Sequence, residues 1–192
     1  MYRTKNGVSP IPNILTSLRI VGGVSLAFIK PLETAFYWVY SLCGVTDVLD
    51  GAIARATDSR TSIGSMLDSA ADLVFYTVTL VRLMPVLLVV MPSWIWYFVG
   101  VIIAVRLCAY AAAALRFGRF ASLHTYLNKL TGAAVFLLPY TLSLRCAPAA
   151  GTAVCVLALA SSGEELIIHL LSGEYRQELK SLLRLSAMKK QK

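Results

Sequence analysis

Charged residues are scarce in this 192-residue chain, and acidic residues are scarcer than basic ones. Asp, Glu, Lys and Arg together make up 15% of the sequence, against about 25% in soluble domains. Apolar residues make up 57%, against roughly 45–50% in soluble domains. This composition excludes a disordered chain, and the absence of a fixed repeat excludes a solenoid. It also argues against a soluble nucleic-acid-binding protein, despite the net charge of +8.

The cysteines do not indicate a disulfide framework or a zinc site. There are four of them, none in a C-x-x-C spacing and all in apolar surroundings: Cys43, Cys108, Cys146 and Cys155. We interpret them as packing residues.

Long apolar runs separated by short polar breaks predict an all-α integral membrane protein. A helix that crosses a membrane needs about 20 mainly apolar residues, and six runs approach that length. These runs are residues 13–29, 35–55, 62–84, 93–116, 124–144 and 148–171. The first run lacks the cleavage site of a signal peptide, so we expect it to stay in the membrane. We interpret residues 1–192 as one membrane domain.

The basic residues predict an orientation. With six crossings, both termini lie on one side of the membrane, and 13 of the 18 Lys and Arg residues then fall on that side. Lys129 is among them, whereas Lys30, Arg82 and Arg145 fall on the other side, and Arg19 and Arg106 are left within spans. The positive-inside rule therefore places both termini in the cytoplasm. Residues 174–192 hold several of these cations and leucines at helical spacing, which predicts a basic amphipathic helix on the membrane surface.

Four aspartates within the second and third predicted spans are the most informative feature of the sequence. A carboxylate at the centre of a bilayer costs at least about 2.5–3.5 kcal/mol. Asp47 and Asp50 are three residues apart, and Asp68 and Asp72 are four apart, so each pair shares one helical face. An antiparallel hairpin through residues 56–61 would bring the two faces together. Four carboxylates would then converge at the cytoplasmic ends of two helices.

Converging carboxylates need a positive charge between them, and few cationic side chains stand nearby in the sequence. Hard divalent cations with oxygen ligands, Mg²⁺ or Mn²⁺, meet this need best. Two such ions held by shared carboxylates would stabilise the attacking and leaving oxygens of a phosphoryl transfer. The alternative is a structural ion-pair cluster, which the shortage of nearby cations disfavours.

Small residues and an arginine accompany these acids. Gly51, Ala54 and Gly64 would let a bulky substrate approach the helix backbone closely. Arg55 lies two turns after Asp47, where its guanidinium could bind a phosphate or a nucleotide. Its alternative role is that of a positive-inside anchor.

In order, these residues spell D-x-x-D-G-x-x-A-R-x8-G-x3-D-x3-D from Asp47 to Asp72. All eight fixed positions match the signature of the CDP-alcohol phosphatidyltransferases, which the chain resembles. The opening Ile11-Pro12-Asn13-Ile14-Leu15-Thr16, with Arg19, is similar to the first helix of the phosphatidylglycerophosphate synthases of that family.

The resemblance implies a homodimeric enzyme with six membrane helices. Such enzymes move a phosphatidyl group from a CDP-linked lipid, usually CDP-diacylglycerol, to the hydroxyl group of a small alcohol, and they release CMP. By the resemblance, Asp47, Asp50 and Asp68 are the principal metal ligands, and Asp72 helps to hold the metals and acts as the general base. The remaining signature positions form the CDP-lipid site: Gly51, Ala54, Arg55 and Gly64.

The identity of the acceptor alcohol is less constrained. The fourth and fifth spans carry a cationic group suited to an acceptor with a phosphate: Arg106, Arg116, Arg119 and Lys129. This favours glycerol 3-phosphate or an inositol phosphate, although Arg106 could instead pair with Glu164 or Glu165. The chain reads Asn128-Lys129-Leu130-Thr131-Gly132 where phosphatidylglycerophosphate synthases usually carry G-K-x-K-T. Inositol, serine and phosphatidylglycerol are therefore alternative acceptors.

Two hypotheses of other classes compete with the enzyme. The acids could line a transport path for divalent cations, although the sequence lacks the inverted repeat of many transporters. The chain could also be an inactive relative with a structural role. Our leading hypothesis is a membrane phosphatidyltransferase of phospholipid biosynthesis whose active site faces the cytoplasm.

Overall fold

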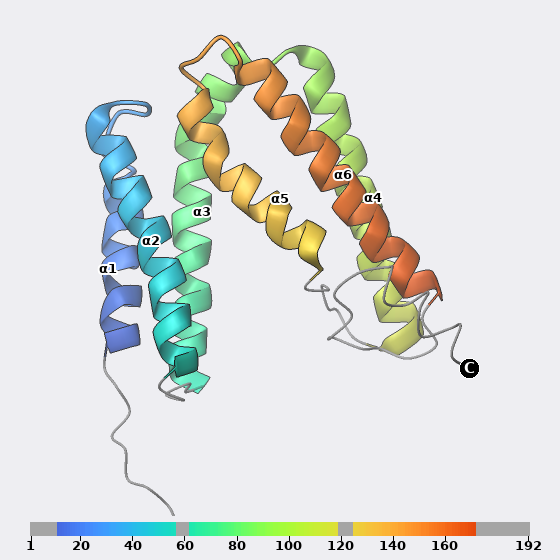
Figure 1. The fold of residues 1–192 in the computed structure, drawn as a ribbon, viewed down its shortest axis with the longest axis horizontal. Coiled ribbons are helices and arrows are strands. Elements are labelled where there is room, and N and C mark those ends of the chain that lie inside the picture. Colours follow the sequence, from blue (N-terminus) through green and yellow to red (C-terminus); the bar gives the residue numbers. More distant parts are fainter. Residues whose placement is uncertain (1–10, 57–61, 119–124, 172–192) are drawn as a thin grey trace, which may run out of the picture. The chain divides into compact units, whose positions relative to one another are not determined.

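All regular structure in the described part of the chain is helical. The computed structural model describes residues 11–56, 62–118 and 125–171. In chain order the elements are α1 (Ile11–Ser25), α2 (Thr34–Ala56), α3 (Ser62–Val90), α4 (Ser93–Phe117), α5 (Tyr126–Leu137), the 3-10 helix η1 (Leu138–Thr141) and α6 (Ala147–Leu171) (Figure 1). The amphipathic helix predicted for residues 174–192 lies outside the described residues.

The chain divides into two compact units. The first comprises residues 1–87 and contains α1, α2 and nearly all of α3, and the second comprises residues 88–192. Each of the six predicted runs corresponds to one α-helix, whose boundaries differ from the prediction by a few residues at most ends. The interpretation of residues 1–192 as a single domain stays a prediction.

Two helices end earlier than their apolar runs predict. The Ser25 hydroxyl donates to the Gly22 carbonyl (2.7 Å), and tighter i to i+3 hydrogen bonds follow, so α1 ends at Ser25 instead of residue 29. Helix α5 ends at Leu137 because Pro139 has no N–H to continue the α-helical pattern, and the chain continues as η1.

Helix α3 is longer than predicted. It runs to Val90, beyond the predicted end at residue 84, with Pro85 inside it. Pro85 removes one backbone hydrogen bond, but the apolar residues around it favour a continued helix, since backbone groups in a lipid environment have no water to replace the bonds within the helix.

Three of the predicted spans meet the length and composition of a membrane-crossing helix. Within the described residues these are Met66–Val90, Ser93–Phe117 and Ala147–Leu170. Helix α2 has sufficient length with 23 residues, but acidic and basic side chains interrupt its apolar sequence. Helices α1 and α5 are shorter, with 15 and 12 residues. The three long apolar helices indicate a membrane protein, and six crossings stay a prediction.

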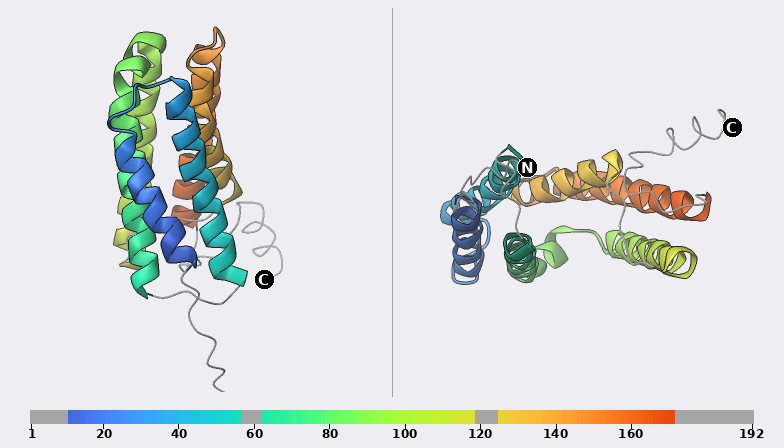
Figure 2. Two further views of the ribbon diagram at one scale, coloured as in Figure 1. Left: turned by 90° about the vertical axis from the view of Figure 1, so that its left-hand side faces the viewer. Right: turned by 90° about the horizontal axis from the view of Figure 1, so that it is seen from below.

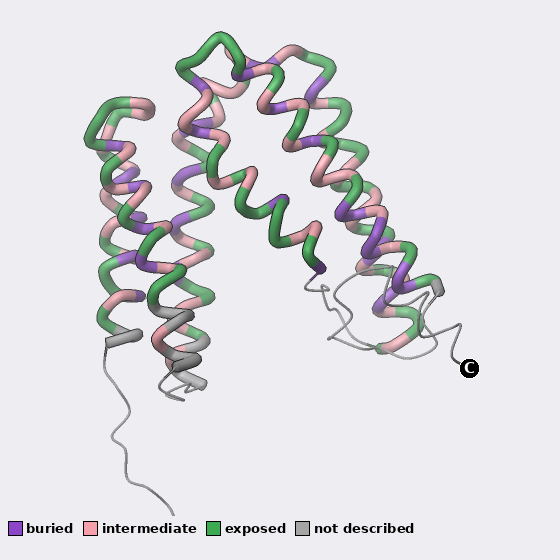
Figure 3. Tube along the Cα trace, in the orientation of Figure 1, coloured by how far each residue is buried: buried purple, intermediate pink, exposed green. Residues whose placement is uncertain are grey.

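Large apolar side chains are exposed along the helices, as the exposed positions in Figure 3 illustrate. Val81 and Val89 of α3 and Leu107 and Leu115 of α4 each have more than half of their surface exposed. Exposed apolar surface on this scale marks contact with a membrane or with another protein. Lipid contact agrees with the composition of these helices.

In the first unit, α1, α2 and α3 lie next to one another, which Figures 1 and 2 show from different sides. The rings of Phe36 and Tyr40 on α2 stack at 5.9 Å, and Tyr40 stacks on Phe75 of α3 at 5.3 Å. All three rings are buried. At the turn after α1, Arg82 of α3 donates to the Ile29 carbonyl (2.6 Å). Aromatic packing and this hydrogen bond hold α3 against the hairpin of α1 and α2.

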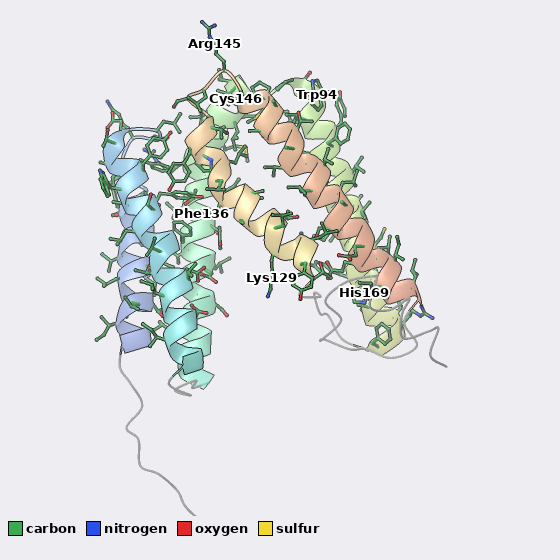
Figure 4. The ribbon with its side chains drawn as sticks, in the orientation of Figure 1. Trp94, Lys129, Phe136, Arg145, Cys146 and His169 are labelled. Carbon is green, nitrogen blue, oxygen red and sulfur yellow. The ribbon has the colours of Figure 1, made fainter. Side chains whose placement is uncertain are left out.

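In the second unit, α6 packs against both α4 and α5. Gly118 ends α4 with a left-handed backbone (φ 64°), and Thr125 begins α5, where its hydroxyl accepts a hydrogen bond from the Asn128 N–H (3.2 Å). Figure 4 shows Lys129 and His169 toward one end of this unit and Arg145 at the other. The basic residues that were predicted to lie on opposite sides of the membrane, Lys129 and Arg145, thus lie at opposite ends of one helical unit.

Candidate functional site

Three of the four predicted acids converge in the first unit around one buried arginine. The Nη1 atom of Arg19 lies 3.0 Å from Oδ1 of Asp47, 3.1 Å from Oδ1 of Asp68 and 2.5 Å from Oδ1 of Asp72. The Arg19 side chain has no exposed surface, whereas the three acidic side chains are 41%, 46% and 37% exposed, in the same order. The cluster therefore combines one residue from α1, one from α2 and two from α3. Its acidic side chains are partly exposed at the surface of the unit, whereas its arginine is buried.

The positions of the acids along their helices place the cluster at one level. Asp47 lies nine residues before the end of α2, and Asp72 lies ten residues after the start of α3. At about 1.5 Å per residue, each lies about 14–15 Å from the helix end next to the connecting segment 57–61. Asp68, one turn earlier on α3, shares the face of Asp72.

Two consecutive glycines let α1 approach the other two helices closely. A Cβ atom at Gly22 would lie 2.6 Å from Sγ of Cys43 on α2, and one at Gly23 would lie 3.2 Å from Cα of Phe75 on α3. Gly22 and Gly23 are three and four residues after Arg19, so they lie on the same face of α1 one turn further along. The glycines thus allow the close packing that carries the Arg19 guanidinium between the acids.

The donor set suits a hard divalent cation. One carboxylate oxygen from each of Asp47, Asp68 and Asp72 lies within 4.8 Å of the other two. Mg²⁺ and Mn²⁺ prefer oxygen ligands of this kind. The single guanidinium of Arg19 leaves an excess of negative charge when all three acids are ionised, which a divalent cation would neutralise.

The structure places the other signature residues only in part. Asp50, Gly51, Ala54 and Arg55 lie within α2, but their side chains are outside the described part of the structure. Gly64 lies in the first turn of α3, on the same helix as Asp68 and Asp72. The predictions that Asp50 is a ligand and that these positions bind the CDP group stay predictions.

The predicted acceptor residues belong to the second unit. Nη2 of Arg106 donates to Oδ1 of Asn128 (2.8 Å) and forms an ion pair with Glu165 (3.9 Å), so one of its two predicted pairings is present. Arg116 of α4 donates to the backbone carbonyls of His169 and Leu170 at the end of α6. Lys129 is exposed. Arg119 lies outside the described residues, and acceptor binding by this group stays a prediction.

Sequence reasoning missed the role of Arg19. By its position in the sequence, Arg19 lies within the first predicted span, and few cations are expected near the acids. In the structure, its guanidinium contacts all three described acids of the cluster. One signal could have pointed to this role, because a buried arginine in an apolar helix requires a negatively charged partner, and the adjacent spans hold four aspartates.

Comparisons with known proteins agree with the geometry. Residues 10–163 match the family described as CDP-alcohol phosphatidyltransferase. A CDP-diacylglycerol–inositol 3-phosphatidyltransferase of Saccharomyces cerevisiae is 34% identical over 89 residues, which are 46% of this chain and 39% of the yeast protein. A cardiolipin synthase (CMP-forming) of Streptomyces coelicolor is 40% identical over 85 residues, which are 40% of this chain and 39% of that protein.

A third relative has another acceptor in its name. A CDP-diacylglycerol–glycerol-3-phosphate 3-phosphatidyltransferase of Cereibacter sphaeroides is 38% identical over 77 residues, which are 37% of this chain and 35% of that protein. The chain thus matches less than half of the length of each of these relatives. No solved structure matches it.

Proposed function

Because the chain belongs to the CDP-alcohol phosphatidyltransferase family, we propose that it moves a phosphatidyl group from CDP-diacylglycerol to a small alcohol and releases CMP. The observation that carries the proposal is the convergence of Asp47, Asp68 and Asp72, whose carboxylate oxygens lie within 4.8 Å of one another. These are three of the four acids of the family signature. Their position within apolar helices fits a reaction whose donor is a membrane lipid.

The residues of the cluster have separate roles in this reaction. Asp47, Asp50 and Asp68 would be the principal ligands of two Mg²⁺ or Mn²⁺ ions, with Asp72 assisting them. When bound, such cations would supply the positive charge that neutralises the diphosphate and the leaving CMP. Asp72 takes the proton from the acceptor hydroxyl as that oxygen bonds to the lipid-side phosphorus. The bond from this phosphorus to the bridging oxygen then breaks, and CMP leaves with both electrons of that bond.

The CDP group of the donor binds next to the acids on the cytoplasmic side. Gly51, Ala54 and Gly64 offer helix surface without bulky side chains, and Arg55 binds a phosphate of the nucleotide. All four positions lie between Asp47 and Asp68 in the sequence, so the helix ends that carry them adjoin the cluster.

We infer that the acceptor is glycerol 3-phosphate. Support comes from the first-helix resemblance to phosphatidylglycerophosphate synthases and from the cationic residues Arg106, Arg116, Arg119 and Lys129, which suit an acceptor phosphate. The names of two relatives above specify inositol and glycerol 3-phosphate, and the third relative is a cardiolipin synthase. An inositol phosphate, inositol, serine and phosphatidylglycerol are the alternative acceptors.

We infer six membrane crossings, with both termini and the active site facing the cytoplasm, and a homodimer. Lys129 and Arg145 lie at opposite ends of the second unit, as the positive-inside rule requires for residues on opposite sides of the membrane (Figure 4). The acids lie toward the helix ends joined by segment 57–61, which is the cytoplasmic end in this orientation.

The proposal is tested by CMP release from CDP-diacylglycerol. The purified protein is supplied with Mg²⁺ or Mn²⁺ and one acceptor at a time. Asp68→Asn and Asp72→Asn are expected to abolish release, because each removes a charged oxygen ligand or the base. Glu33→Gln is the matched control, since Glu33 pairs with Lys30 in the connection between α1 and α2, away from the cluster. Undiminished turnover in both aspartate variants would refute the assignment.

The same assay identifies the acceptor. Release with glycerol 3-phosphate alone, together with a raised KM for it in Arg116→Ala, would support the inferred acceptor. Equal rates with neutral alcohols and an unchanged KM in Arg116→Ala would contradict a phosphate-binding role for that residue. Manganese flux into proteoliposomes without CMP release from any acceptor would favour a cation transporter instead.

A further inference from the structure

Arg19 occupies the position that a metal ion bound to the same three carboxylate oxygens would need. Its Nη1 atom lies within 2.5–3.1 Å of one oxygen of each of Asp47, Asp68 and Asp72. These three residues form the described acidic cluster that could hold a metal. A magnesium ion binds its oxygen ligands at about 2.0–2.1 Å. A cation and the guanidinium therefore cannot share all three oxygens, since they would overlap and repel each other.

We propose that Arg19 is the resident counter-ion of the acid cluster, which holds the three carboxylates together before a divalent cation binds and gives them up when it binds. The inference rests on the proposed function only for the identity of the metal site. Without a positive charge, three carboxylates within 4.8 Å would repel one another and separate their helices. Arg19 supplies this charge from a third helix, so α1 joins α2 and α3 in one ion-paired group.

The surroundings of Arg19 favour a role in preparing the site. Its side chain has no exposed surface, and glycines one turn away bring α1 close to both partner helices. The acids, in contrast, are between 37% and 46% exposed. A divalent cation can thus reach the acids from their accessible side and displace the guanidinium, which contacts them from the buried side.

The proposal predicts opposite effects on stability and on metal affinity when Arg19 is neutralised. Arg19→Gln removes the counter-ion, so the metal-free protein is destabilised by repulsion among the acids. It also removes the competitor, so divalent cations bind more tightly. Replacing a residue that merely supports the ligands or the fold would lower both the stability and the metal affinity, or would lower the stability and leave the metal affinity unchanged.

The experiment compares Arg19→Gln with Arg82→Gln and the unmodified protein in lipid nanodiscs. Arg82 is a suitable control because it is another arginine of the first unit, and it donates to the Ile29 carbonyl away from the acids. Thermal unfolding is recorded in EDTA and in saturating Mn²⁺, and Mn²⁺ affinity is measured by electron paramagnetic resonance. Neither measurement requires a substrate.

For Arg19→Gln we expect the unfolding midpoint in EDTA to fall by at least about 4 °C. Saturating Mn²⁺ should restore most of this loss, and the dissociation constant for Mn²⁺ should fall at least about tenfold. Arg82→Gln should lower the midpoint equally with and without Mn²⁺ and leave the dissociation constant unchanged.

Weaker or unchanged Mn²⁺ binding in Arg19→Gln would overturn the proposal. If that variant does not fold in EDTA, Arg19→Lys decides, since a lysine keeps the charge but cannot present a planar guanidinium to all three acids. Tighter Mn²⁺ binding in Arg19→Lys would support the proposal, and unchanged or weaker binding would refute it. Tighter binding in a protein that releases no CMP would uphold the role of Arg19 and reject the proposed function.

Discussion

Replacing Gly23 with alanine (Gly23→Ala) is expected to destabilise the first unit and disturb the acid cluster. The added Cβ atom would lie 3.2 Å from Cα, 3.4 Å from N and 3.5 Å from Cβ of Phe75. Backbone atoms of α3 cannot rotate away as the end of a flexible side chain can, so the two helices must separate by a few tenths of an ångström. Overpacking of this kind costs about 1–3 kcal/mol.

A matched control separates this clash from the helix propensity of alanine. An alanine in a helix interior is favoured over glycine by about 0.8–1 kcal/mol, which offsets part of the cost at position 23. A Cβ atom added at Gly100 of α4 would meet no other atom within 4 Å, so Gly100→Ala should gain this propensity without a clash. The two variants should therefore differ in free energy of unfolding by about 1–3 kcal/mol.

Thermal unfolding in nanodiscs, followed by intrinsic fluorescence, measures this difference. A change of 1 kcal/mol shifts the midpoint by about 2–4 °C in a chain of this size, so Gly23→Ala should unfold at least about 2 °C below Gly100→Ala. Phe75 lies three residues after Asp72, so the displacement of α3 should also lower CMP release by about three- to tenfold. A Gly23→Ala protein as stable and active as Gly100→Ala would refute the close approach of α1 and α3.

Three further predictions concern the site and the second unit. Removing divalent cations with EDTA should stop CMP release, and adding Mg²⁺ or Mn²⁺ back should restore it; persistent release in EDTA would contradict the metal site. Thr125→Ala should lower the free energy of unfolding by about 1 kcal/mol because it removes the hydroxyl that caps α5, whereas Thr125→Ser should retain stability in the same thermal assay. Glu165→Ala removes the buried partner of Arg106 and should cost about 1–3 kcal/mol, measured by thermal unfolding; a midpoint equal to that of the unmodified protein would show that the pair contributes little.

The helices and the acids could be predicted because both depend on short-range patterns. Apolar runs of sufficient length predict helices, and a spacing of four residues places Asp68 and Asp72 on one face whatever the rest of the fold does. The meeting of Asp47 with this pair is also expected from the short connection between α2 and α3. The convergence of these three acids is confirmed by the structure.

Helix ends and span assignments were harder to predict. The predicted third span ends just before Pro85, but α3 continues through this proline, whereas Pro139 does interrupt α5. The residues after Pro85 are apolar up to Met91, whereas Thr141, Ser143 and Arg145 follow Pro139, so only the sequence after Pro85 favours a continued helix in an apolar environment. Within the described residues, three helices have both the length and the apolar composition of a membrane span. The apolar runs of the sequence predicted six spans and did not distinguish these three from the shorter helices α1 and α5 or from the more polar helix α2.

The amino-acid sequence by itself determined the helical class, the family signature and the acidic faces of α2 and α3, because each depends on residue type and local spacing. Tertiary structure decided which cation meets the acids and which glutamate meets Arg106. Arg19 reaches Asp47, Asp68 and Asp72 only because Gly22 and Gly23 let α1 pack closely on two other helices. Contacts between residues about 30 to 50 positions apart depend on how whole helices pack, and no local spacing encodes that packing.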